Sequence, residues 1–174
     1  MIVISSGHGK YIRGAEGLID EVNEARKVVP LVAALLRAHG EQVIEFHDNT
    51  STTQDENLDT IIDFHNSMDR DLDVSVHFNA YEPTPDPRGT EVWFSTQAEL
   101  AAAVSEAIAE AGMLIDRGAK QSDSLAFLNR TDKPAILIEV CFVDSEEDVD
   151  HYHDHFREIC GGIAKAISDD AVSI

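Results

Sequence analysis

The sequence is poor in cysteine and in long apolar runs, and each shortage excludes a class of protein. Only two cysteines occur among 174 residues, so the chain is not a disulfide-stapled scaffold. Cys141 and Cys160 both lie in apolar segments and are expected to be free, buried thiols. No run of roughly 18 apolar residues occurs, which excludes a membrane-spanning helix. Residues 1–6 lack the basic start and long apolar region of a secretory signal, so we expect synthesis and folding in a cytoplasm.

Basic residues are also scarce. The sequence has 13 Lys and Arg residues but 33 Asp and Glu residues, which gives a formal net charge of −20. Binding to nucleic acid or to an anionic membrane usually needs a basic patch, so neither partner is expected. The acidity would suit solubility or tolerance of high salt, and it says nothing direct about a substrate. With 43% hydrophobic residues, the 174 residues fit one ordinary globular domain with a single core.

Apolar, β-branched stretches alternate with segments of helical periodicity. The expected strands are residues 2–6, 42–47, 73–79, 89–95 and 135–143. The expected helices run from Glu21 to His39, from a Thr53 cap through His65, over about 97–111 and over about 153–168. This alternation predicts an α/β fold with a largely parallel sheet. We expect a single domain over residues 1–168, with 169–174 as a tail or the stub of a linker.

Three segments have a polar side chain at the end of an expected strand or within an apolar strand. His8, within Gly7-His8-Gly9, follows the first strand, and His77 lies near the end of the third. Glu139 stands in the middle of an apolar strand, where a carboxylate is costly unless it is paired or used. The carboxyl ends of parallel strands meet at one edge of a sheet, where sites gather. We therefore expect these three side chains to lie close together.

Two histidines and a carboxylate at one edge suit the chemistry of a zinc hydrolase. Zinc in such enzymes takes three protein ligands from His, Glu or Asp and keeps one position for water. The metal lowers the pKa of that water, and a carboxylate outside the ligand set accepts its proton. In this interpretation His8 and His77 bind the metal and Glu139 is the base.

The third ligand should come from the acidic start of the first long helix, where spacing leaves three candidates: Asp20, Glu21 and Glu24. Acidic residues are also expected there because they interact favourably with the helix dipole, so the pattern does not choose among them. Glu139 has a structural alternative as well, as the buried ion-pair partner of Arg117 or Lys120.

The other histidines are weaker candidates for metal ligands. His151, His153 and His155 alternate along an expected helix start, so their side chains diverge and do not readily bind one ion. They are interpreted as a solvated helix start. His39, His47 and His65 are interpreted as packing or surface residues.

Together these segments resemble the zinc-dependent N-acetylmuramoyl-L-alanine amidases (amidase type 3) of bacterial wall remodelling and phage lysis. The matching motifs are Gly7-His8-Gly9, a Glu opening the first helix, Ser75–Ala80 and Pro134–Val143. The similarity runs from Ile2 to about Ile167 and is greatest to the phage endolysin catalytic-domain branch, through residues 50–54, 117–120 and 127–129. The family usually has a second Gly after His-Gly, where this chain has Lys10, a difference that bears on the shape of the site mouth.

The resemblance implies a twisted, mostly parallel sheet of about six strands flanked by helices, with one Zn²⁺ per chain. It implies that His8, Glu21 and His77 are the metal ligands, with Glu21 preferred over Glu24 because of its distance from Gly40. Glu139 would be the catalytic base. The candidate substrate contacts are Asn79, Arg117, Lys120 and Asn129. Asn79 has an alternative as a strand cap, and Arg117 and Lys120 as ordinary surface bases.

The implied reaction is hydrolysis of the amide between N-acetylmuramic acid and the first L-alanine of the stem peptide, by zinc-activated water. The partner is then peptidoglycan, and the role is that of an endolysin or autolysin acting on the wall after release or holin-type export. A wall-binding domain or a targeting partner outside this chain would fit that role. The alternatives are a non-catalytic wall-binding relative and a zinc peptidase that cleaves another peptidoglycan bond.

Overall fold

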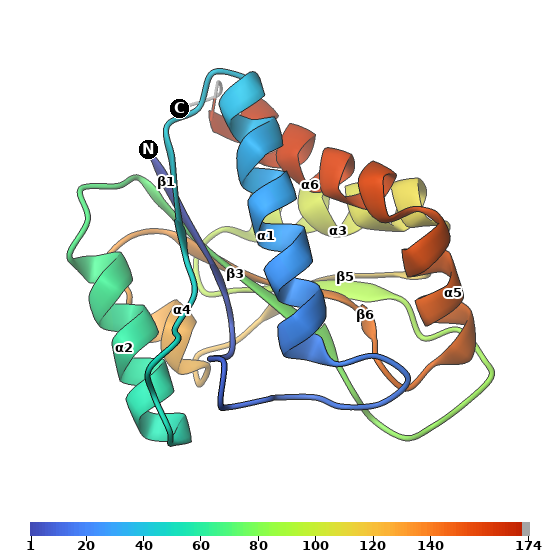
Figure 1. Ribbon diagram of the computed structural model, residues 1–174. Helices are drawn as coiled ribbons and strands as arrows, with labels where there is room; N and C mark the ends of the chain where they lie inside the picture. Colours follow the sequence, from blue (N-terminus) through green and yellow to red (C-terminus); the bar gives the residue numbers. More distant parts are fainter. Residues whose placement is uncertain (172–174) are drawn as a thin grey trace.

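A six-stranded sheet in the order β2-β1-β3-β6-β4-β5 forms the middle layer of the fold (Figure 1). The computed structural model describes residues 1–171. The strands are β1 (Ile2–Ser6), β2 (Val43–Phe46), β3 (Leu72–Asn79), β4 (Thr90–Phe94), β5 (Asp116–Gln121) and β6 (Ala135–Phe142). All neighbouring strands are parallel except β4 and β6, which are antiparallel. The expected mostly parallel sheet of about six strands is therefore confirmed.

Helices lie on both faces of the sheet (Figure 1). One face carries α1 (Glu21–Ala38), α3 (Ala98–Gly112) and α6 (Phe156–Ala171), and the other carries α2 (Gln54–Asn66) and α4 (Ala126–Arg130). The short helix α5 (Glu146–Asp154) leads into α6. None of the helices described over residues 1–171 combines the length and apolarity needed to cross a membrane.

Alternation along β6 divides the apolar side chains between two cores. Ile136 and Ile138 point into the large core beneath α1, α3 and α6, whereas Ala135 and Leu137 join a smaller cluster with α2 and α4. Both expected thiols, Cys141 and Cys160, are free and lie in the large core, as the sequence predicts. The smaller cluster leaves room on its face of the sheet for polar side chains at the carboxyl edge.

Most expected elements occur with small shifts at their ends, and the chain also forms short elements that were not predicted. The helix expected over about 153–168 occurs as α6, with both ends shifted toward the C-terminus, and a short helix that was not predicted, α5, precedes it and is separated from it at His155 (φ −116, ψ 21). Helix α6 also continues to Ala171, so part of the expected tail is helical, and the rest of it lies outside the described residues. Strand β5 and the five-residue helix α4 were not predicted, because β5 contains no β-branched residue and α4 is too short to show a period.

A buried polar network ties β1, β3 and α2 together. His65 Nδ1 donates to Asp73 Oδ1 at 2.7 Å, and His65 Nε2 lies 2.9 Å from Ser5 Oγ. Arg70 donates to both carboxylate oxygens of Asp73, at 2.9 and 2.7 Å. Ser5, His65 and Asp73 have the connectivity of a catalytic triad, but all three are completely buried and no substrate reaches them. The network is therefore structural, and His65 is a buried hydrogen-bonding residue.

The ionisation of Asp73 depends on this network. Burial alone would raise the pKa of Asp73, yet the hydrogen bonds from His65 and Arg70 and their positive charge hold it below its ordinary value. The ionised carboxylate is thus the form that the folded protein favours.

Asp73→Asn should lower the free energy of unfolding by about 3 kcal/mol, because it leaves the buried guanidinium of Arg70 without its carboxylate. The effect is measured at neutral pH by urea unfolding followed by circular dichroism. Since the pKa of Asp73 is depressed in the folded protein, its contribution is present above the unfolded pKa of about 3.9 and is lost as the pH falls through the lower folded value. The difference between parent and variant should therefore narrow below roughly pH 4.

Asp59→Asn is the matched control, since the side chain of Asp59 forms an exposed ion pair with Arg130. It should leave the urea midpoint unchanged. Equal midpoints for the Asp73 and Asp59 variants would show that the network does not stabilise the fold.

Candidate metal centre

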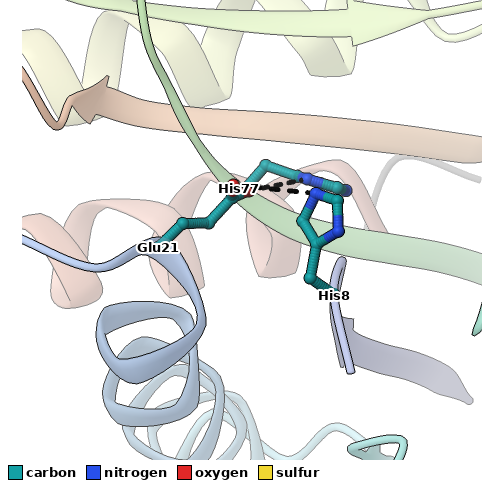
Figure 2. A group of neighbouring side chains, drawn as sticks. All are labelled: His8, Glu21 and His77. Carbon is teal, nitrogen blue, oxygen red and sulfur yellow. Dashed lines mark hydrogen bonds and ion pairs between the residues drawn. The ribbon is translucent and has the colours of Figure 1, made fainter. Parts of the chain in front are cut away.

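Three side chains from different elements meet at the carboxyl edge of the sheet. His8 follows β1, His77 lies near the end of β3, and Glu21 opens α1. One ligand atom from each residue lies within 4.8 Å of the others. Figure 2 shows the two imidazoles and the carboxylate converging on one point. The parallel pairing of β1 with β3 brings the two histidines together, as the sequence predicts.

Glu21 is held in place by main-chain donors as well as by the histidines. Its Oε1 lies 2.9 Å from His77 Nδ1 and accepts from the Phe78 amide at 3.1 Å. Its Oε2 accepts from the Ala15 amide at 2.6 Å and lies 3.6 Å from His8 Nε2. Burial alone would raise the pKa of Glu21, but the hydrogen bond and charge of His77, followed by His8, hold it below the ordinary value. The carboxylate therefore stays ionised and fixed.

The two imidazoles have different environments. Burial lowers the pKa of His8 to about 4, with His77 adding to the decrease and Glu21 opposing it. Burial would also lower the pKa of His77, but its hydrogen bond to Glu21 and the charges of Glu21 and Glu139 raise it above the ordinary value. His8 is consequently neutral near pH 7, and its buried Nδ1 has no hydrogen-bond partner. Neutral imidazole is the form that binds metal ions.

Two glycines make room for this group. A Cβ at Gly7 would lie 1.8 Å from His77 Nε2. A Cβ at Gly14, which has φ +66, would lie 2.3 Å from Glu21 Oε2 and 2.6 Å from His8 Cδ2. Residue 7 must therefore be glycine because His77 leaves no space for a side chain there. This requirement is separate from the backbone flexibility of glycine.

The carboxylates that compete with Glu21 in the sequence are engaged elsewhere. Asp20 is the N-cap of α1, where its side chain accepts from the Asn23 amide and pairs with Arg13. Glu24 accepts from Tyr152 Oη at 3.1 Å and from Lys27 Nζ at 2.7 Å. Neither belongs to the group formed by His8, Glu21 and His77.

Glu139 lies on β6 in register with His77 on β3. Its Oε2 is buried without a hydrogen-bond partner, and over residues 1–171 Glu139 forms no ion pair, so the alternative pairing with Arg117 or Lys120 is wrong. Burial raises the pKa of Glu139 to about 8; Glu21 and Glu91 add to the rise and His77 opposes it. A buried carboxyl with a free oxygen beside the three-residue group is placed to exchange a proton there.

A second buried carboxylate, Glu91, was not singled out from the sequence. It is the antiparallel partner of Glu139 across β4 and β6, and it is only 4% exposed. Its Oε1 accepts from Asn79 Nδ2 at 3.0 Å and its Oε2 from Arg117 Nε at 2.7 Å. The signal that points to Glu139, a carboxylate within an apolar strand, is also present at Glu91, within Thr90–Phe94, and would have identified it.

The remaining candidates lie at different distances from the group. Asn79 and Arg117 are joined to the site through Glu91, whereas Lys120 is half-buried farther along β5, in register with Trp93. Asn129 is exposed on α4, and its Nδ2 donates to the carbonyl oxygen of Leu125, the N-cap residue of that helix.

A cleft of about 300 Å³ opens beside the group on the α2 and α4 side. Its polar lining includes Ser75, His8, His77 and Glu139, and its apolar lining includes Leu58, Ile61, Leu125, Phe127 and Leu137.

Known proteins share both the sequence pattern and the fold. A family model described as N-acetylmuramoyl-L-alanine amidase matches residues 2–169. An uncharacterized 38.4 kDa protein of Clostridium perfringens is 35% identical over 184 residues, which cover 99% of this chain and 53% of that protein. A probable cell wall amidase, LytH, of Staphylococcus saprophyticus is 25% identical over 154 residues, 86% of this chain and 50% of the relative. The chain thus spans about half the length of the curated relatives it matches.

Among solved structures, the catalytic domain of the CD27L endolysin, which targets Clostridium difficile, is 26% identical with a TM-score of 0.86. The match covers 97% of this chain and 96% of that domain. The amidase AmiC2 of Nostoc punctiforme has the same fold, with 24% identity, a TM-score of 0.86 and coverage of 99% and 97%. Since the family match extends over nearly the whole chain, the protein belongs to the N-acetylmuramoyl-L-alanine amidase family.

Proposed function

We propose that this chain hydrolyses the amide between N-acetylmuramic acid and L-alanine in peptidoglycan, in an endolysin or autolysin role. The observation that carries the proposal is the meeting of His8, Glu21 and His77 beside the free carboxylate oxygen of Glu139. Membership of the amidase family supports the choice of bond, and the likeness to an endolysin catalytic domain supports the role. The remaining length of the relatives is consistent with a separate wall-binding part or targeting partner.

The proposed cofactor is one Zn²⁺ per chain, held by His8, Glu21 and His77. Two imidazoles and one carboxylate form a donor set that zinc hydrolases use. The neutral state of His8 and the ionised state of Glu21 both suit a cation. When bound, zinc supplies Lewis-acid chemistry, which lowers the pKa of water and polarises a carbonyl.

Glu139 is the proposed general base and acid. Its carboxylate accepts a proton from the water that adds to the scissile carbonyl carbon. The same proton then passes to the alanine nitrogen as the carbon–nitrogen bond breaks. The products are a lactyl carboxylate on the sugar and a peptide with a free N-terminal alanine. Burial raises the pKa of Glu139 to about 8, and the positive charge of a bound zinc ion would favour the ionised carboxylate that the first step requires.

Of the proposed substrate contacts, Asn79 and Arg117 have the strongest support, because Glu91 joins both to the strand next to Glu139. Lys120 adds positive charge farther along the same strand as Arg117. For Asn129 the support is weakest, since its amide is already engaged within α4.

Glu21→Gln should reduce zinc affinity at least 10–100-fold, the range typical of losing a group that only supports a ligand. Glu24→Gln is the matched control: it makes the same chemical change one helical turn away, at a carboxylate engaged with Tyr152 and Lys27, and it should retain one zinc per chain. Metal content is measured by atomic absorption after dialysis of the folded proteins. A parent protein that binds no divalent metal, or loss of metal from the Glu24 variant alone, would contradict the assignment.

Glu139→Gln should keep its zinc but lose about 10²–10⁴-fold in hydrolysis, because the amide side chain does not take up the proton. Dye release from labelled peptidoglycan measures the rate, and metal analysis of the same sample shows that the site is loaded. In parallel, a chelator should abolish dye release by the parent, and added zinc should restore it. Undiminished turnover in the Glu139 variant would mean that another group is the base.

The bond that is cleaved distinguishes the proposed activity from its alternatives. Mass spectrometry of digested peptidoglycan should detect intact stem peptides that begin with a free L-alanine. Shortened stem peptides would indicate a zinc peptidase. Binding to the wall without any released fragment would indicate a non-catalytic relative.

A further inference from the structure

The polar side chains of the site form a row across the edge of the sheet. In the strand order β1-β3-β6-β4-β5, the residues at this edge are His8, His77, Glu139, Glu91 and Arg117. Neighbouring strands lie about 4.8 Å apart, so the strand of Arg117 is roughly 10 Å beyond that of Glu139. The row begins with His8 and His77, two of the proposed metal ligands, and ends with the guanidinium of Arg117.

The Arg117 side chain is oriented from two sides. Its Nε donates to Glu91 Oε2 at 2.7 Å, which turns the guanidinium back toward the strand next to Glu139. The guanidinium carbon also lies 5.1 Å from the centre of the Phe142 ring. The side chain is nevertheless 39% exposed, so Arg117 is fixed in direction while it remains open to solvent.

Arg88 approaches the same ring. Its guanidinium carbon lies 5.7 Å from the centre of Phe142 and 4.9 Å from that of Tyr81, a ring that is 74% exposed. The Arg88 Nε is buried without a hydrogen-bond partner. Two guanidinium groups therefore face one aromatic ring in a chain whose net charge is −20. Each guanidinium has one carboxylate beside it: Arg117 donates to Glu91, and Glu82 Oε1 lies 3.9 Å from Arg88 Nη2, which donates to the Glu82 carbonyl oxygen at 3.1 Å.

We propose that Arg88 and Arg117 form a carboxylate subsite that takes the free α-carboxylate of the second residue of the stem peptide. This inference rests on the proposed function. The second residue of the stem peptide is a glutamate joined through its side chain, so its α-carboxylate is free unless it is amidated. Two extended residues span about 7 Å, which carries this carboxylate from the scissile amide beyond Glu139 toward Arg117. The planar fork of a guanidinium matches a carboxylate with two hydrogen bonds.

The subsite sets the direction in which the substrate lies. The anionic peptide would cross β6 and β4 toward the two arginines, and the uncharged sugar would lie on the other side of His77, toward β1. Lys120 is not part of this subsite, because it pairs in register with Trp93 farther along β5.

The test compares two muropeptides that differ only in whether the α-carboxylate of the second residue is free or amidated. The parent enzyme should have a kcat/KM about tenfold higher for the free form, as expected for a charge-assisted hydrogen bond. Arg117→Gln and Arg88→Gln should each bring the ratio close to one, mainly through a higher KM for the free form. Arg37→Gln is the matched control: Arg37 pairs with Glu45 and belongs to no part of the site, so the variant should keep both activity and ratio.

The outcomes separate this inference from the proposed function. Equal kcat/KM values for the two muropeptides in an active parent enzyme would overturn the subsite and leave the amidase activity intact. A preference that persists in both arginine variants, with unchanged thermal midpoints, would also overturn it and would point to another cation such as Lys120. Failure of the zinc-loaded parent to cleave either compound would count against the proposed function itself.

Discussion

Parallel pairing of β1, β3 and β6 is the constraint on which the site depends. The register sets Ser6 beside Val76 and His77 beside Glu139, and His8 follows two residues after Ser6. Because successive side chains alternate between faces, a slip of one residue in either pairing would turn His77 or Glu139 into the large core. The same register sends the apolar residues of these strands under α1, α3 and α6. Packing of the core and geometry of the site are thus specified by one set of strand contacts.

Buried charge is balanced locally almost everywhere in the described chain. Asp73 is surrounded by His65 and Arg70, and the Glu24 carboxylate by Tyr152 and Lys27. Buried polar atoms in folded proteins are nearly always hydrogen-bonded, so unpaired ones call for an explanation. Two such atoms, His8 Nδ1 and Glu139 Oε2, belong to the candidate metal centre. The candidate metal centre differs in this respect from the Ser5–His65–Asp73 network, whose side chains are hydrogen-bonded to one another.

Site residues that are marked by a local sequence pattern could be predicted, whereas those that depend on contacts between residues far apart in the sequence could not. Local patterns were sufficient to single out His8, His77 and Glu139, because each stands at a strand end or interrupts an apolar run. The choice between Glu21 and Glu24 depends on Tyr152, which is 128 residues from Glu24 in sequence, and no local pattern contains that contact. Strand β5 likewise exists through its pairing with β4 and has almost no apolar signal of its own. Side chains that depend on such distant partners need the fold before their roles can be assigned.

The loop before β4 is attached to the domain through its main chain. The buried carboxylate of Asp148 accepts from the amides of Arg88, Gly89 and Phe142. The donors are main-chain amides, so these bonds do not depend on the side chains of the preceding loop, residues 82–87. Surface loops of this kind tolerate variation when a rigid scaffold holds their ends. A substitution of this single aspartate on α5 would therefore displace Arg88 and the start of β4 together.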